Sequence, residues 1–212
     1  MQRINLAAHL YCSLFFCDRI IGERGMAKKI NINNADVWQP LCFAAATIER
    51  MYPNFVLFDE VSQGQSAKVF RVALDLVWEF LATDQAKIDF VKQYDKLEEI
   101  TPDPDDYDFY GVWPALDACV ALSTLLECCA GQDECKAGAF IRLSIATIES
   151  YIETSGFEGK PETHPLIADH HSFCQELDHL LAAKAPKNTV IKSVKNLVSA
   201  WPVSNIGLDL SV

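Results

Sequence analysis

The chain has 212 residues, of which half are hydrophobic and 22% are charged, and its formal net charge is −11. That length and composition fit one ordinary domain with a substantial core, and they exclude wholesale disorder. A strongly negative chain repels phosphate backbones and anionic lipid headgroups, so the charge disfavours a nucleic-acid or membrane partner.

The first 25 residues stand apart from the rest of the sequence. Residues 4–17 form an apolar run that is long enough for a signal-peptide core but too short to span a bilayer comfortably. We interpret residues 1–25 as an N-terminal extension outside the fold. A packed extra helix and a secretion or membrane signal are the alternatives. Residues 26–212, starting at Met26, are expected to form a single helical domain.

Eight helices are predicted, because apolar residues recur at steps of three and four and capping or breaking residues stand at the ends. Pro53 is expected to separate the first two helices, and Ser66 to cap the third. No segment has the two-residue alternation of a β-strand. In chain order the predicted helices cover about residues 34–51, 53–62, 66–83, 84–100, 112–130, 133–154, 163–185 and 188–200.

The fifth predicted helix, about residues 112–130, is apolar on most of its sides. A helix of that kind is typical of the middle of a helical domain. The predicted fold is therefore all-α, an irregular bundle of seven to eight helices around this central apolar helix.

The cysteines are interpreted as reduced thiols of a cytoplasmic protein, because a chain of this length with this core needs no disulfides. They stand at positions 12, 17, 42, 119, 128, 129, 135 and 174. Cys128, Cys129 and Cys135 flank one short connection and offer an alternative, a thiolate metal set. They lack a paired C-x-x-C and an evident fourth ligand, so no metal site is predicted there.

The stretch "DYDFYGVWPALDACVALS", residues 106–123, crowds acids and aromatic rings in front of the central helix. One interpretation is structural: Pro114 occupies the first helical turn, Asp108 caps it, and the rings clamp the loop against the bundle. The other is a recognition surface, since aromatic rings with polar handles also grip a partner. The candidate binding surface consists of Tyr107, Asp108, Tyr110 and Trp113.

Acids within apolar helices are the candidates for chemistry. Asp75 and Glu79 share a helix face at four-residue spacing, and Asp117 lies one turn into the central helix. A structural network in which such acids meet arginines is one interpretation. The alternative is a carboxylate- or metal-dependent enzyme with a site near Asp75, Glu79 and Asp117.

No cofactor and no metal site are predicted from the remaining motifs. The aspartates that begin at Asp103 fail the spacing of a calcium-binding loop. Glu176 and His179 make one Glu-x-x-His, whereas a paired di-metal site needs two. His170 and Cys174 share a helix face, as metal ligands can, but the histidines of this helix are interpreted as surface residues.

Four segments resemble the YjaG family of bacterial proteins of unknown function: "ERMYPN" (residues 49–54), "LDLVWE" (74–79), residues 106–123, and "SNIG" (204–207). The resemblance spans about Asp36 to Gly207 and leaves out 156–171. It implies an all-helical fold and a loose association with signalling. It implies no established reaction, cofactor or catalytic residue.

The first functional hypothesis is therefore a cytoplasmic helical module that binds a protein partner in regulation, through the loop before the central helix. A homodimer is one form that such an interaction can take. The enzyme with an acidic cluster is the second hypothesis. The sequence names neither a ligand nor a partner.

Overall fold

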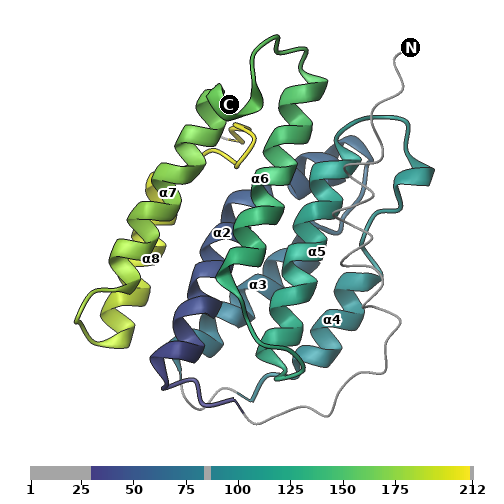
Figure 1. Ribbon diagram of the computed structural model, residues 1–212. Helices are drawn as coiled ribbons and strands as arrows, with labels where there is room; N and C mark the ends of the chain where they lie inside the picture. Colours follow the sequence, from purple (N-terminus) through teal and green to yellow (C-terminus); the bar gives the residue numbers. More distant parts are fainter. Residues whose placement is uncertain (1–29, 84–86, 211–212) are drawn as a thin grey trace.

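The computed structural model describes residues 30–83 and 87–210, and this part of the chain folds into seven α-helices without a β-strand (Figure 1). The all-α prediction is confirmed. The predicted extension, residues 1–25, lies outside the described residues. The elements are α2 (Ala35–Val61), α3 (Ala67–Ala82), α4 (Phe90–Glu98), the short 3-10 turn η1 (Pro104–Asp106), α5 (Val112–Cys129), α6 (Ala137–Thr154), a second 3-10 turn η2 (Pro161–Thr163), α7 (Pro165–Leu181) and α8 (Lys187–Ala200).

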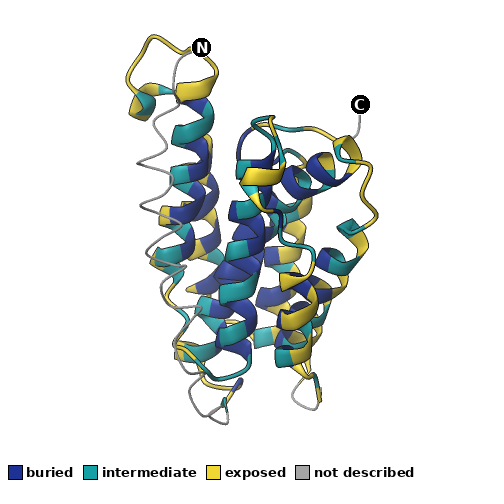
Figure 2. Ribbon diagram, turned by 90° about the vertical axis from the view of Figure 1, so that its right-hand side faces the viewer, coloured by how far each residue is buried: buried dark blue, intermediate teal, exposed yellow. Residues whose placement is uncertain are grey.

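Two helices share the centre of the bundle. α5 has the bounds that the sequence predicts and is buried along most of its length (Figure 2). α2 is the longest helix at 27 residues, and it packs most extensively against α5 and also against α3, α6, α7 and α8. α7 and α8 pair with each other at one side of the bundle (Figure 1).

The apolarity of α5 follows from its place in the core. By length and composition it is the one helix in the described part of the chain that could cross a membrane. Leu122, Leu125 and Leu126 are fully buried among the neighbouring helices, so the bundle itself accounts for the apolar sequence. A buried core helix and a membrane span look alike in composition.

α2 runs through Pro53 without interruption, so the predicted break between two helices is wrong. A proline inside a helix costs one backbone hydrogen bond and about 3 kcal/mol. Packing beyond the proline favours continuation. The ring of Phe55 stacks on Phe70 of α3 at 5.1 Å, and Phe58 meets Tyr107 edge-on at 4.9 Å. Burial of two aromatic rings offsets the cost of the proline.

The start of α3 is capped by a residue of α2. The carboxylate of Asp59 accepts hydrogen bonds from the backbone N–H groups of Ser66 and Ala67, both at 2.9 Å. Ser66 occupies the N-cap position, as predicted, but its side chain makes no capping bond. Gly64 is required in the turn, because a Cβ there would collide with the Asp59 carboxylate.

Two other helices start later than predicted. α4 begins at Phe90, where Asp89 caps it by accepting from the N–H of Lys92 at 3.0 Å. α6 begins at Ala137 rather than near Asp133. The side chain of Asp133 instead accepts from the adjacent N–H of Glu134, which keeps the α5–α6 connection non-helical.

We expect Leu122→Ala to lower the free energy of unfolding by about 2–5 kcal/mol, because it opens a cavity beneath a fully buried side chain. Urea unfolding followed by circular dichroism measures this. Val72→Ala is the control, since Val72 is 42% exposed on α3, and it should cost less than about 1 kcal/mol. Equal costs for the two variants would contradict the central position of α5.

Candidate functional site

The middle of α2, residues 49–54, is where segments far apart in the sequence meet. Glu49 faces α3, whereas Arg50 and Asn54 contact the residues that follow α8. We call residues 201–208 the C-terminal segment. In Figure 1 its yellow trace returns between α6 and α7. Three of the four segments that resemble the YjaG family are thus in contact at one place on α2.

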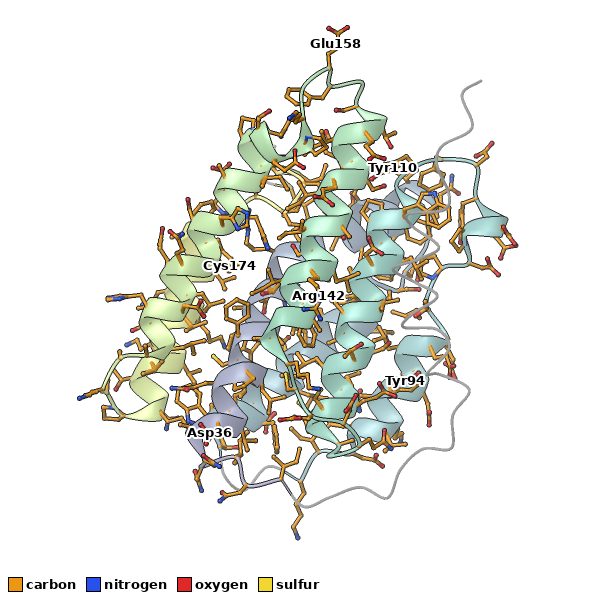
Figure 3. The ribbon with its side chains drawn as sticks, viewed as in Figure 1. Asp36, Tyr94, Tyr110, Arg142, Glu158 and Cys174 are labelled. Carbon is orange, nitrogen blue, oxygen red and sulfur yellow. The ribbon has the colours of Figure 1, made fainter. Side chains whose placement is uncertain are left out.

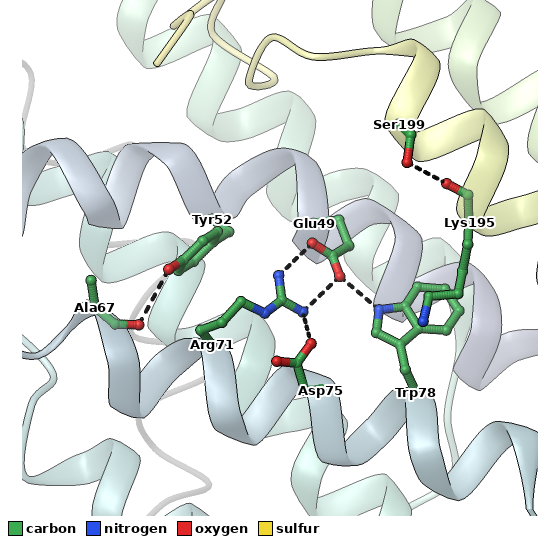
Figure 4. Close-up of polar contacts among 8 residues, drawn as sticks. All are labelled: Glu49, Tyr52, Ala67, Arg71, Asp75, Trp78, Lys195 and Ser199. Atoms are coloured by element: carbon green, nitrogen blue, oxygen red, sulfur yellow. Dashed lines mark hydrogen bonds and ion pairs between the residues drawn. The ribbon is translucent and has the colours of Figure 1, made fainter. Parts of the chain in front are cut away.

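Glu49 is the acceptor at the centre of an ion-pair network with α3 (Figure 4). Its two carboxylate oxygens pair with Arg71 Nη1 at 2.7 Å and Nη2 at 2.8 Å, and Trp78 Nε1 donates to Oε1 at 2.7 Å. Asp75 adds a second carboxylate at 2.8 Å from Arg71 Nη2. Burial lowers the pKa of Arg71, but the hydrogen bonds and charges of Glu49 and then Asp75 outweigh it and raise the pKa.

The three acids of the enzyme hypothesis have different surroundings. The side chain of Asp75 is 63% exposed, and Glu79 is also exposed on α3. Asp117 is buried and faces α6, where Thr147 Oγ1 donates to its Oδ2 at 2.7 Å. Asp75 therefore belongs to the Arg71 network and Asp117 to the α5–α6 interface.

Asp117 is the acid with the most perturbed titration. Burial raises its pKa to about 7, against the lowering effect of the Thr147 hydrogen bond. A carboxyl that exchanges its proton near neutral pH is typical of catalytic acids and also of structural buried acids. Its contact with Thr147 ties the first turns of α5 to the middle of α6.

Arg50 is a buried cation on the opposite side of α2, with 3% of its surface exposed. Its guanidinium carbon lies 4.9 Å from the ring centre of Phe173 on α7 and 4.9 Å from that of Trp201. Nη2 donates to the carbonyl of Ser204 at 3.3 Å. Among the described residues, Nε and Nη1 have no hydrogen-bond partner. Burial lowers the pKa of Arg50, while Cys174 and Asp169 act to raise it.

Neutral polar groups continue from Arg50 into the bundle. Asn54 Nδ2 donates to Asn205 Oδ1 at 2.8 Å, and Asn205 Nδ2 donates to Ser144 Oγ at 3.1 Å. Ser144 Oγ lies 3.5 Å from His170 Nδ1. We call Arg50, Asn54, Ser144, His170 and Asn205 the buried polar centre; all five are less than 4% exposed.

His170 is buried at 1% exposure, so its interpretation as a surface histidine is wrong. Burial, followed by the charges of Arg50 and His171, lowers its pKa to about 4, and the ring is neutral at pH 7. Cys174 Sγ lies 3.6 Å from His170 Nε2, and burial raises the pKa of this thiol to about 11. Figure 3 shows Cys174 on α7. Arg50 is thus the charged member of an otherwise neutral centre.

The loop before α5 is held on the bundle by aromatic contacts. Phe58 of α2 contacts Tyr107 edge-on and stacks on Phe109 at 5.9 Å. Tyr110 donates to Ser150 Oγ on α6 at 3.3 Å, and burial raises its pKa to about 12. Trp113 is half-buried against the core. The structural part of the sequence interpretation, rings that clamp the loop, matches these contacts.

Asp108 does not cap α5, which is a correction to the sequence prediction. The N-cap position is Gly111 and has no side-chain bond, while Asp108 is exposed. The aspartates at 103, 105 and 106 are exposed as well, so the loop presents carboxylates outward and rings inward. The large apolar side chains exposed in the described ranges lie elsewhere: Leu57, Val61, Val72, Phe157 and Leu210.

The thiols and histidines do not gather into a metal-ligand set in the described part of the chain, where no group of three or more such residues converges. The six cysteines in that part are free thiols, and Cys135 alone of them is more than slightly exposed. Burial raises the pKa of Cys42 to about 12, as expected of a core thiol that serves packing.

Sequence reasoning singled out the segment 49–54, which contains Arg50, and separately His170 and "SNIG", but it did not predict that they are in contact. The available signal was the placement of polar residues inside apolar helical patterns, as at Ser144 and Asn54. Such residues must find partners when buried. Their partners come from segments 61 to 154 positions away, which helical periodicity does not reveal.

The structure is therefore an all-helical bundle organised on α2, with a buried arginine beside its C-terminal segment. A family model described as "Protein of unknown function (DUF416)" matches residues 28–209. The chain belongs to this family, and the resemblance to YjaG proteins is confirmed.

Bacterial relatives match over most of the chain. An uncharacterized protein of Haemophilus influenzae is 36% identical over 84% of this chain and 94% of its own length. The uncharacterized protein YjaG of Salmonella typhimurium is 34% identical over 85% and 95%. The crystal structure of a DUF416 family protein from Shewanella baltica has a TM-score of 0.75 at 30% identity, and the match covers 86% of this chain and all of that one.

The carboxylates of Glu49 and Asp75, which both pair with Arg71, are expected to contribute unequally to stability. We expect Glu49→Ala to lower the free energy of unfolding by about 2–3 kcal/mol, because it leaves Arg71 and Trp78 Nε1 poorly paired in a half-buried place. Asp75→Ala should cost less than about 1 kcal/mol, since Asp75 is mostly exposed. Urea unfolding measures both, and the reverse order would contradict this assignment.

Asp117 predicts a specific pH dependence. Its pKa is raised from 3.8 to about 7 on folding, so between these values the folded chain holds a proton that the unfolded chain has released. The wild-type free energy of unfolding should therefore fall relative to Asp117→Asn as the pH rises from 4 to 7. The fall approaches about 1.4 kcal/mol per pH unit and levels off above pH 7. Urea titrations across this range test it, and a pH-independent difference would refute it.

Proposed function

We propose that this protein is a cytoplasmic helical module that binds a protein partner in regulation, with the acidic loop as its contact surface. The acidic loop is defined as residues 103–113. It contains all four residues of the candidate binding surface: Tyr107, Asp108, Tyr110 and Trp113. The relatives are uncharacterised, so the proposal rests on the loop itself.

The observation that carries the proposal is the anchoring of the loop. Tyr107 and Phe109 both contact Phe58, and Tyr110 bonds to α6, so the backbone between them is fixed before any partner arrives. A surface that is already ordered avoids the entropy cost of ordering the loop on binding. In Figure 1 the η1 turn projects from the body of the bundle, where a partner can reach it.

The charge of the loop indicates the kind of partner. Exposed aspartates at 103, 105, 106 and 108 give it a negative surface, which favours a basic segment of another protein and repels nucleic acid and anionic lipid. The enzyme alternative draws no support from the placement of its three acids, because Asp75 and Glu79 are exposed on α3 whereas Asp117 faces α6.

A photo-cross-linking residue placed at position 105 tests the surface in cells of a bacterium that carries the protein. We expect one discrete cross-linked product that weakens at least about tenfold when Asp103, Asp106 and Asp108 are changed to lysine, because charge reversal at an interface costs several kcal/mol. The product's mass, from mass spectrometry, distinguishes a foreign partner from a second copy of this chain.

The matched control reverses acids at a different exposed site, with Glu158→Lys and Glu162→Lys near η2. These changes raise the net charge by four units, against six in the acidic loop, and should leave the cross-link intact. A cross-link that survives reversal in the acidic loop, or that is lost equally in the control, would overturn the proposal.

A further inference from the structure

We propose that Arg50 anchors a binding site for a small oxyanion, a carboxylate or a phosphate, that the C-terminal segment closes. This site is separate from the acidic loop and does not rest on the proposed partner. The side chain of Arg50 is 3% exposed, and its hydrogen-bond donors are only partly satisfied by the described residues.

A guanidinium has two faces and an edge of five N–H donors, and these need different partners. The rings of Phe173 and Trp201 lie against the guanidinium of Arg50 and form cation–π contacts with it. The edge needs oxygen acceptors in its plane. In the described chain the edge has one, the Ser204 carbonyl on Nη2, and Nε and Nη1 have none.

Arg71 shows how this protein neutralises an arginine when the partner is built in. Both Nη atoms of Arg71 contact carboxylates, from Glu49 on the neighbouring helix and from Asp75 one turn away. The side chain of Arg71 is 27% exposed and only its Nε is buried without a partner, whereas Arg50 is 3% exposed and forms no ion pair within the described residues. The more buried arginine thus has the fewer acceptors.

Within the described part of the chain, the other members of the buried polar centre and Cys174 carry no negative charge. His170 is neutral, the Cys174 thiol is protonated, and Asn54, Ser144 and Asn205 are uncharged. Asp169 of α7 acts on Arg50 electrostatically but is exposed, so solvent screens its charge. A site with one fixed cation, aromatic walls and neutral hydrogen-bonding groups is suited to an oxyanion, because charge-assisted bonds to carboxylate or phosphate are what a guanidinium forms best.

The C-terminal segment covers this site and is held by polar contacts. The N–H of Asn205 donates to the Arg50 carbonyl at 2.8 Å, and the Asn205 side chain bonds to Asn54 and Ser144. The segment turns back on itself through Ser204, whose Oγ accepts from two backbone N–H groups, and through Gly207 at φ +84°. It follows the end of α8, so moving it away would break no helix but would separate Ile206 from Ile148, Ile152 and Ile167, with which it packs. An oxyanion would replace the Ser204 carbonyl at Nη2 and reach Nε.

Trp201 reports on the site because its ring lies against the guanidinium. We expect sodium phosphate, sodium acetate or both to produce a saturable change in tryptophan fluorescence at an ionic strength held constant with sodium chloride. Saturation by phosphate alone assigns a phosphate ligand, and saturation by acetate alone assigns a carboxylate. The absence of a saturable response to either anion would overturn the proposal.

Arg50→Met removes the charge and keeps the volume, and such replacements of buried charges are commonly tolerated. It should weaken the response at least about thirtyfold, as expected when a buried charged partner is removed. Arg142→Met is the matched control on exposed α6 surface, shown in Figure 3, and should respond like the wild type. A response retained in Arg50→Met, or lost equally in Arg142→Met, would refute the site.

A second measurement uses the wild-type chain, so it does not depend on whether a variant folds. Hydrogen exchange of the wild-type chain should show that the anion changes the protection of the Asn205 and Leu208 amides, which are bonded within the closed segment or to α2. Amides of α3, on the far side of α2, should not change. If a saturating concentration of the anion leaves hydrogen exchange in the C-terminal segment unchanged, the closing role of this segment is overturned.

Discussion

Burial of the Arg50 charge is the constraint on which the rest of this structure depends. Placing a guanidinium in a protein interior costs several kcal/mol before its partners are counted. Two aromatic contacts return about 1–2 kcal/mol each, and the Ser204 carbonyl adds one hydrogen bond. Those partners come from α7 and from the C-terminal segment, so both elements stabilise the buried arginine of α2.

Glu49, the residue before Arg50, carries the opposite charge and contacts a different helix. Successive helical side chains point about 100° apart, so Glu49 and Arg50 leave α2 in different directions. Glu49 holds α3 through Arg71 and Trp78, while Arg50 holds α7 and the segment after α8. Two adjacent residues of opposite charge thus attach α2 to different elements and do not pair with a common partner. This is why α2 is the common element of the bundle, and why continuity through Pro53 is worth its cost.

The helices were predictable because each depends on its own sequence, and α5 ends within a residue of its prediction. The errors arose where a partner from another segment decides the outcome. Asp59 caps α3 from α2, Phe58 packs on Tyr107 beyond Pro53, and Ser144 of α6 lies beside the buried His170. Periodicity shows which face of a helix is buried but not what lies against it. The three acids of the enzyme hypothesis therefore all lie within apolar helical patterns, but they lie at different sites in the structure.

Stability alone does not explain an arginine at position 50. An apolar side chain of similar volume would fill the space between Phe173 and Trp201 without any desolvation cost, and such replacements commonly stabilise proteins. Packing specificity is one reason to retain a buried charge, but a charge that specifies packing normally has its hydrogen-bonding edge satisfied by the fold, as Arg71 largely does. In the described chain the edge of Arg50 remains mostly unmatched, and its cover is a short segment outside any helix. Binding of an anion therefore explains this buried and incompletely paired arginine better than a role in joining helices does.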